Sequence, residues 1–172
     1  VGPVVFGHDP SLPPVKRDLT EARRLLADAG YPNGLDLDLE FRSGRRVEPL
    51  LAQLAEIGIR ARPRPQSYTD HSARMIDDQV ELYYGGAMAG TGDASDLLDS
   101  LLHSRLADRS LGESNTIGYG NPLLDALIES AARQNRMADR RRTLQLSLRL
   151  ALTDLPLVPL VIPEDIYGVR EG

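Results

Sequence analysis

The sequence contains no cysteine and no tryptophan, and its single lysine, Lys16, stands beside 19 arginines. Without cysteine the chain has no disulfides, no thiolate metal sites and no cysteine nucleophile. No apolar run reaches the roughly 18 residues that span a bilayer. The net charge of −5 argues against a nucleic-acid partner. What remains is a chain of 172 residues, 41% apolar, which is enough for one substantial domain with its own core.

Motifs for the common catalytic chemistries are also missing. There is no Gly-x-Ser-x-Gly nucleophile elbow and no phosphate loop of the Gly-Lys-Ser/Thr kind. Gly85, Gly86, Gly90 and Gly92 do not fit the spacing of a dinucleotide-binding loop. We therefore expect no enzyme activity and no cofactor.

Titratable residues give no stronger signal. The histidines lie far apart, which favours surface or helix-cap roles over metal ligation: His8, His71 and His103. Neighbouring carboxylates are more typical of solvated acids than of a catalytic pair: Asp77, Asp78, Asp93 and Asp96. No metal site is predicted. A group of arginines around Arg140 to Arg142 indicates a solvated helix face.

The most informative segment is a run of small residues, Gly85-Gly86-Ala87-Met88-Ala89-Gly90-Thr91-Gly92-Asp93. Side chains this small leave backbone amides and carbonyls open to a partner. The run follows an apolar stretch, Val80 to Tyr84, predicted to be a buried strand. A long loop after such a strand is where α/β proteins commonly place ligands, so the loop indicates binding.

Periodicity predicts alternating helices and strands behind an extended, proline-rich arm over residues 1–14. Helices are predicted over residues 19–29, 47–57, 68–78, 97–102, 122–131 and about 138–152, and strands over 35–41, 59–65, 80–84 and 157–162. Residues 104–120 read as irregular. Pro159 makes the last strand an edge or a crossing segment. This order predicts an α/β fold, a layered, mostly parallel or mixed sheet flanked by helices.

Two of the predicted strands carry opposite charges on one face. The strand over 35–41 presents Asp36, Asp38 and Glu40, and the strand over 59–65 presents Arg60, Arg62 and Arg64. These side chains pair if the strands are neighbours. The alternative is two solvated faces, and each exposed pair would stabilise the fold by at most about 1 kcal/mol.

The motifs also occur in the order found in a known family. Asp18-Leu-Thr-Glu-Ala-Arg-Arg-Leu-Leu-Ala-Asp-Ala-Gly-Tyr-Pro-Asn-Gly34 resembles a segment of the family 5 (peptide/nickel type) extracellular solute-binding proteins of ABC transporters. Weaker matches follow along the chain at Leu35 to Glu40, Leu54 to Ile59, Gly92-Asp93, Asn115, Gly118 to Ile128 and Asp154 to Leu160.

The resemblance implies that residues 1–172 are the carboxy-terminal ligand-binding lobe of a type II periplasmic-binding-protein-like fold. Members of this family trap a solute between two lobes that close about a hinge. Residues 1–14 and 163–172 would then be crossing segments to an amino-terminal lobe. The implied partners are a small-molecule or peptide solute and an ABC permease in the membrane. The implied location is extracytoplasmic, either periplasmic or membrane-anchored at the cell surface.

The small-residue loop departs from the peptide-binding members of that family. They carry roughly Gly-Trp-x-x-Asp here, and the aspartate pairs with the peptide amino terminus. Alignment places Ala87 at the tryptophan and Gly90 at the aspartate. A buried amine without a carboxylate is costly, so we expect no simple recognition of an α-amino group unless Asp93 or Asp96 substitutes.

We predict a half-clamshell receptor for peptides or another small solute. Its cleft-facing residues are predicted to be Tyr84, Gly86, Ala87, Met88, Gly90, Asp93, Asn115 and Tyr119. The alternatives are half-buried packing for Tyr84 and Tyr119, loop stabilisation for Asn115 and a helix cap for Asp93. An alternative function is a stand-alone interaction or enzyme domain that reuses this lobe.

Overall fold

The computed structural model describes residues 1–13, 16–76, 80–162, 168 and 170. The chain divides into two compact units, one formed by residues 13–87 and the other by residues 1–12 together with 88–172. Each unit has its own hydrophobic cluster. None of the described helices is long and apolar enough to cross a membrane.

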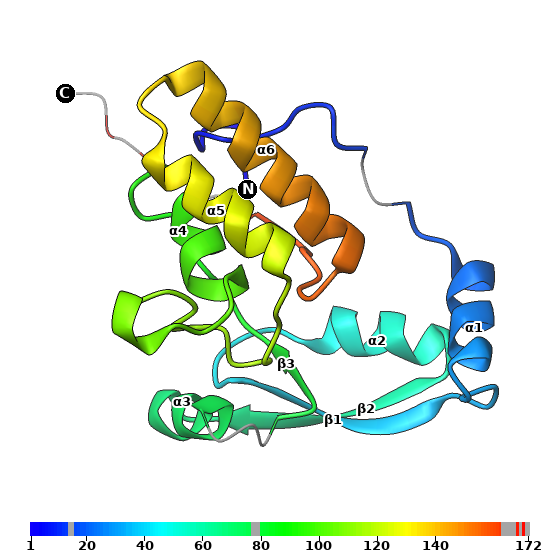
Figure 1. Ribbon diagram of the computed structural model, residues 1–172. Coiled ribbons are helices and arrows are strands. Elements are labelled where there is room, and N and C mark those ends of the chain that lie inside the picture. The colour runs from blue at the N-terminus through cyan, green and yellow to red at the C-terminus, as the bar shows by residue number, and fades with distance from the viewer. Residues whose placement is uncertain (14–15, 77–79, 163–167, 169, 171–172) are drawn as a thin grey trace. The chain divides into compact units, whose positions relative to one another are not determined.

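The unit of residues 13–87 is built on a parallel sheet (Figure 1). Its elements are α1 (Leu19–Asp28), β1 (Leu35–Arg42), α2 (Glu48–Glu56), β2 (Ile59–Gln66), α3 (Tyr68–Ile76) and β3 (Leu82–Tyr84). The three strands lie in the order β2-β1-β3, with Leu35 beside Ile59 and Leu39 beside Leu82. The predicted α/β fold with a mostly parallel or mixed sheet flanked by helices is confirmed, and all the strand pairs described are parallel. Residues 77–78 of the predicted third helix lie outside the described residues.

Alternation along β1 decides which helix covers which face. Leu39 and Phe41 are buried and pack with Val47, Leu50 and Leu51 of the α2 region. Glu40 points the other way and is buried too, because Arg74 of α3 binds its carboxylate. The helices α2 and α3 therefore lie on opposite faces of the sheet.

The predicted charge pairing between strands is confirmed for Asp36 and Asp38, while Glu40 binds Arg74 of α3 instead. Asp36 and Arg60 lie opposite each other on β1 and β2, and their side chains pair at 2.8 Å. Asp38 accepts from both Arg62 and Arg64. One prediction for this unit is wrong: β3 is half-buried rather than buried. The reason is its place at the edge of the sheet, where only one neighbour covers it.

A close approach of two glycines sets the distance between the starts of β1 and β2. Gly34 has a positive φ of 77°, and a side-chain carbon there would lie 1.9 Å from the carbonyl oxygen of Gly58. Asn-Gly is a strong turn sequence, and only glycine permits this contact.

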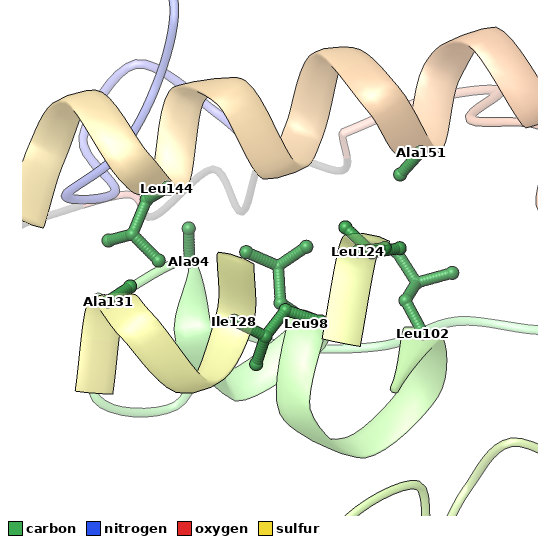
Figure 2. Packing of buried hydrophobic residues seen from close by; sticks show 8 residues of the cluster. All are labelled: Ala94, Leu98, Leu102, Leu124, Ile128, Ala131, Leu144 and Ala151. Carbon is green, nitrogen blue, oxygen red and sulfur yellow. The ribbon is translucent and has the colours of Figure 1, made fainter. Parts of the chain in front are cut away.

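The second unit is largely helical. Its elements are α4 (Ser95–Leu97), which continues into a π-helix, η1 (Leu98–Leu102), then a short 3-10 turn, η2 (Ala107–Arg109), α5 (Pro122–Arg133) and α6 (Met137–Asp154). Asn121 caps α5 by accepting from the amides of Leu123 and Leu124. The core lies where α5, α6 and the α4–η1 segment meet (Figure 2): Ala94, Leu98, Leu102, Leu124, Ile128, Ala131, Leu144 and Ala151.

The amino-terminal arm is held in this unit by a β-bridge and by side chains of α6, with Gln145 donating to the carbonyl of His8 and Arg149 binding Asp9. The amide of Phe6 donates to the carbonyl of Gly92 at 2.8 Å, and the amide of Ala94 donates to Phe6 at 2.9 Å. The arm is not extended as predicted, because turns closed by the amides of Val5 and His8 fold it back on itself, and it lies directly beside the end of the small-residue loop.

The predicted strand over residues 157–162 is wrong. This segment is irregular and has no ladder partner among the described residues. Pro159 cannot donate to a ladder, and the side chains of Val158, Leu160, Val161 and Ile162 are all exposed. A side-chain carbon at Gly2 would lie 3.4 Å from Ile162, so the arm runs beside this exposed apolar segment.

Candidate functional site

The predicted cleft-facing residues are divided between the two units. Tyr84, Gly86 and Ala87 end the first unit, and the other residues belong to the second: Met88, Gly90, Asp93, Asn115 and Tyr119. The small-residue loop is exposed at its middle residues. Met88 is 82% exposed, and a side chain added at Gly90 would meet no other atom within 4 Å. The loop therefore presents open backbone, as its composition predicts.

Asp93 is already engaged by its own unit. Both of its carboxylate oxygens accept from the Arg140 guanidinium, and Oδ1 also accepts from the amide of Ser95 at 2.9 Å. Burial acts to raise the pKa of Asp93, but the hydrogen bonds from Arg140 and Ser95 outweigh it and lower that pKa. The carboxylate thus stays charged and holds the first turn of the next helix, which agrees with the capping alternative.

Asn115 has a similar internal task. It is buried, and its amide nitrogen donates to the carbonyls of His103 at 2.9 Å and Tyr119 at 2.6 Å. Its amide oxygen accepts from the amide of Tyr119 at 3.1 Å. Every polar atom of the side chain is therefore used to fix the loop that follows η1. The loop-stabilising alternative describes this residue, while ligand contact by Asn115 stays a prediction.

Tyr119 is half-buried against the helical core, and its hydroxyl donates to Asp154 at 2.7 Å. Burial, and next the bond to Asp154, raise the pKa of Tyr119 to about 12. The phenol therefore remains protonated and tied to the end of α6. Contact between Tyr119 and a ligand also stays a prediction.

The π-helix has a local role in the same region. Its widened turn is marked by the amide of His103 donating to Leu98, five residues back, at 2.9 Å. The carbonyls of Asp99 and Ser100 then accept from the loop amides of Gly112 and Ser114. The π-helix thus supplies the acceptors that hold the Asn115 loop against the core.

Residues that the sequence reasoning missed lie at the carboxyl ends of the parallel strands. Arg42 ends β1, and Arg45 and Arg46 follow it in the next turn. The amide of Ser43 donates to the carbonyl of Gln66, so this turn lies beside the end of β2. We call Arg42, Arg45 and Arg46 the basic edge.

The topology makes this edge a favoured place for a ligand. The chain leaves β1 to one face through α2 and leaves β2 to the opposite face through α3, so β1 and β3 adjoin at a topological switch point. Ligands of open α/β sheets bind outside the carboxyl ends of the strands at such a point.

Aromatic rings orient the basic edge. The Arg45 guanidinium lies over the ring of Tyr84, 5.6 Å from its centre, and Arg42 lies over Tyr68 at 5.3 Å. A side chain at Gly86 would come within 3.1 Å of Arg45, so glycine leaves this guanidinium room. Tyr84, one of the predicted site residues, thus orients the Arg45 guanidinium, and its own contact with a ligand stays a prediction.

The basic edge is suited to an anion. Its three guanidinium groups are exposed, and none has a carboxylate partner within the described part of the chain. Guanidinium binds carboxylate or phosphate through two parallel hydrogen bonds. By contrast, the described residues contain no group of three acidic or histidine side chains arranged to hold a metal ion.

The remaining histidine and acidic candidates have local partners or lie outside the description. His8 and His103 each approach a backbone carbonyl, of Val1 and Ser104 respectively, and Asp96 accepts from both the amide and the hydroxyl of Thr91. Residues 77 and 78 and the side chain of His71 lie outside the described residues.

No family model matches the chain. Curated relatives are found over most of its length. It is 24% identical to heme-binding protein A of Haemophilus influenzae over 166 residues, which cover 91% of this chain and 30% of the relative. It is 27% identical to the glutathione-binding protein GsiB of Escherichia coli K12 over 172 residues, 94% of this chain and 33% of the relative. The chain thus spans about a third of the length of these relatives.

Solved structures also match the chain over about a third of their own length. The periplasmic binding protein DppA of Helicobacter pylori, in complex with the peptide STSA, superposes with a TM-score of 0.82 at 26% identity, over 92% of this chain and 31% of that one. A dipeptide-binding protein from Pseudoalteromonas sp. SM9913, in complex with Met-Leu, gives a TM-score of 0.78 at 20% identity, over 90% and 32%. The second likeness shows the fold alone.

These likenesses define the class of protein first: the fold is that of part of a type II periplasmic binding protein. They also confirm the resemblance to the family 5 extracellular solute-binding proteins of ABC transporters, of which this chain corresponds to about one third. The relatives and structures are named for binding a solute rather than for catalysis.

Proposed function

We propose that this chain is the carboxy-terminal ligand-binding lobe of a receptor for ABC-transporter import. The receptor binds a small solute between two lobes and delivers it to a permease in the membrane, and it works outside the cytoplasm. The chain is similar to about one third of the length of proteins that bind peptide, glutathione or heme, and this similarity supports the role. The lobe binds and performs no covalent chemistry.

The observation that carries the proposal is the basic edge at the switch point of the sheet. Arg42, Arg45 and Arg46 offer guanidinium groups that have no carboxylate partner among the described residues, beside the glycine start of the small-residue loop. A solute that carries a carboxylate or phosphate group fits this arrangement. Cation–π stacking on Tyr84 holds Arg45 in one orientation before the solute arrives, which lowers the entropic cost of binding.

The small-residue loop favours an anionic group over an α-amino group as the recognised feature. Ala87 and Gly90 stand where peptide-binding family members carry tryptophan and aspartate. Asp93 and Asp96, the possible substitutes, already bind Arg140 and Thr91. A free amine would therefore find no uncommitted carboxylate on this loop, and burying it unpaired is costly.

An amino-terminal lobe of the receptor would account for the exposure of the apolar segment at residues 158–162. Val158, Leu160, Val161 and Ile162 are between 51% and 73% exposed and run beside the amino-terminal arm. We infer that residues 1–14 and 163–172, of which only 1–13, 168 and 170 are described, cross to the amino-terminal lobe of the receptor and that this lobe covers the apolar segment. Covering such a patch also removes an aggregation hazard.

Calorimetric titration of the two-lobed receptor tests the proposal. Small carboxylates and phosphate esters should bind, and matched neutral amides should bind at least about tenfold more weakly. Arg45→Gln should weaken binding of the anions about tenfold to a hundredfold, because a charge-assisted bond is lost. The control is Arg17→Gln, which removes a charge paired to Glu56 in the same unit. Equal affinity for anions and amides would refute anion recognition.

Titration of residues 1–172 alone separates the receptor from a stand-alone domain. The proposal expects weak binding, because half of the enclosing contacts come from the other lobe. Tight binding by this chain alone would instead support an independent interaction domain.

A further inference from the structure

The connection between α5 and α6 carries a second group of exposed arginines. Arg133 ends α5, Arg136 precedes α6, and Arg141 and Arg142 lie in the second turn of α6. The two helices run antiparallel, so these residues gather at one end of the hairpin (Figure 1). We call Arg133, Arg136, Met137, Arg141 and Arg142 the basic corner.

Few carboxylates balance this charge. Within the described residues Arg136 and Arg141 have no acidic partner, and Arg141 instead lies 4.9 Å from the centre of the Phe6 ring. Arg142 pairs with Asp139 at 3.8 Å, with both side chains well exposed, and Arg133 shares Glu129 with Arg109. The four arginines thus stand against two carboxylates, Glu129 and Asp139. The corner is therefore net positive in a chain whose net charge is −5.

An apolar side chain lies within the same corner. Met137 is the first residue of α6, directly after Arg136, and it is 62% exposed. An exposed apolar side chain among arginines matches the boundary between lipid headgroups and acyl chains, where cations meet phosphate and apolar groups leave water. An acidic protein surface would also satisfy the guanidinium groups. A bilayer is favoured because it presents phosphate groups and an apolar layer side by side along its whole surface.

We propose that the basic corner binds the surface of an anionic phospholipid bilayer. The guanidinium groups bind lipid phosphates in their bidentate geometry, and Met137 enters the headgroup layer. The acidic remainder of the chain is repelled by the same surface, so binding also orients the molecule. The inference stands independently of solute binding, because none of these residues belongs to the basic edge.

Vesicle sedimentation tests this inference with the 172-residue chain. Vesicles of about 30% phosphatidylglycerol in phosphatidylcholine should bind the chain at low salt, and pure phosphatidylcholine vesicles should not. Binding should fall steeply when the salt rises to about 150 mM, because the Debye length shortens. The triple variant Arg136→Gln, Arg141→Gln, Arg142→Gln should bind at least about tenfold more weakly.

A matched control removes the same charge elsewhere. Arg17→Gln, Arg62→Gln, Arg64→Gln should keep wild-type binding to the anionic vesicles, since these arginines lie in the other unit. Met137→Ser should weaken binding severalfold with the net charge unchanged. Circular dichroism verifies that each variant is folded.

Three results would overturn the inference. The first is equal binding to neutral and anionic vesicles, and the second is equal loss in the two triple variants. The third is corner-dependent binding to a soluble polyglutamate peptide with none to vesicles, which would identify an acidic protein as the partner.

Discussion

The carboxylate of Asp93 and the guanidinium of Arg140 form a two-point ion pair that joins the end of the small-residue loop to α6 across 47 residues of sequence. Arg140 also lies over the ring of Phe6, 5.5 Å from its centre, and donates to the hydroxyl of Ser95 at 3.3 Å. One side chain thus connects the amino-terminal arm, the loop and α6. The small-residue loop is open in its middle and firmly anchored at this end.

Breaking this pair should destabilise the chain. Arg140→Gln leaves the carboxylate of Asp93 largely desolvated and without its cation, and we expect a loss of about 1–3 kcal/mol, less than a fully buried pair because both side chains are about one-fifth exposed. Urea unfolding followed by circular dichroism measures it. Arg142→Gln, at an exposed pair three residues apart, is the control and should cost less than about 0.5 kcal/mol. Equal losses would contradict the anchoring role of Arg140.

The contact between Asp9 and Arg149 should make stability depend on acid pH. Hydrogen bonds from Arg149, and next from Ser11, lower the pKa of Asp9 from 3.8 to about 2. Because the folded pKa is the lower one, the stabilisation is complete above pH about 4 and is lost as the pH falls towards 2. Urea midpoints between pH 7 and 2 test this. Asp9→Asn should make the urea midpoint depend less steeply on pH. An unchanged pH dependence would show that other carboxylates cause it.

Asn115→Ala should loosen the loop that follows η1. The substitution leaves the carbonyl of His103 and both backbone groups of Tyr119 without their side-chain partner, which should cost about 2–3 kcal/mol. Hydrogen exchange at the amide of Tyr119 should accelerate more than exchange in α5. Asn135→Ala, at an exposed position between α5 and α6, is the control. Unchanged exchange at Tyr119 would show that the backbone bonds to η1 hold the loop without Asn115.

Two glycines with the same sign of φ should respond differently to alanine. Gly34→Ala places a methyl group 1.9 Å from the carbonyl oxygen of Gly58, so the starts of β1 and β2 must separate, and we expect a loss above about 3 kcal/mol. Gly30→Ala meets no atom within 4 Å and has only its positive φ of 92° to accommodate, at about 1 kcal/mol. Thermal unfolding of the two variants gives the comparison. Equal shifts in Tm would attribute both effects to backbone strain.

Local patterns predicted most of the elements. Asp18 caps α1 and Asn121 caps α5 through their side-chain oxygens, as their positions before apolar stripes indicate. The alternation of Leu35, Leu37 and Leu39 with acids predicted β1. The strand predicted over residues 157–162 is wrong because an apolar run has the same sequence pattern whether it pairs in a sheet or packs against another surface. The described residues provide no strand that pairs with it.

The candidate residues could be predicted only in part. The openness of Gly90 and Met88 follows from composition. The commitment of Asp93 to Arg140 and of Asn115 to His103 depends on contacts between distant segments, which no local pattern contains. Residues 42–46 received no role from the sequence, because the importance of the basic edge depends on which strands lie beside β1.

The sequence by itself determined the class of fold, the motif order shared with solute-binding proteins and a loop without bulky side chains. These follow from periodicity, capping residues and side-chain size, which act within a few residues of one another. Tertiary structure alone decided which charges are free. It paired Asp93 with Arg140 and left Arg45 over Tyr84 without a carboxylate partner in the described part of the chain, because the availability of a charged group depends on what the folded chain brings within a few ångströms of it.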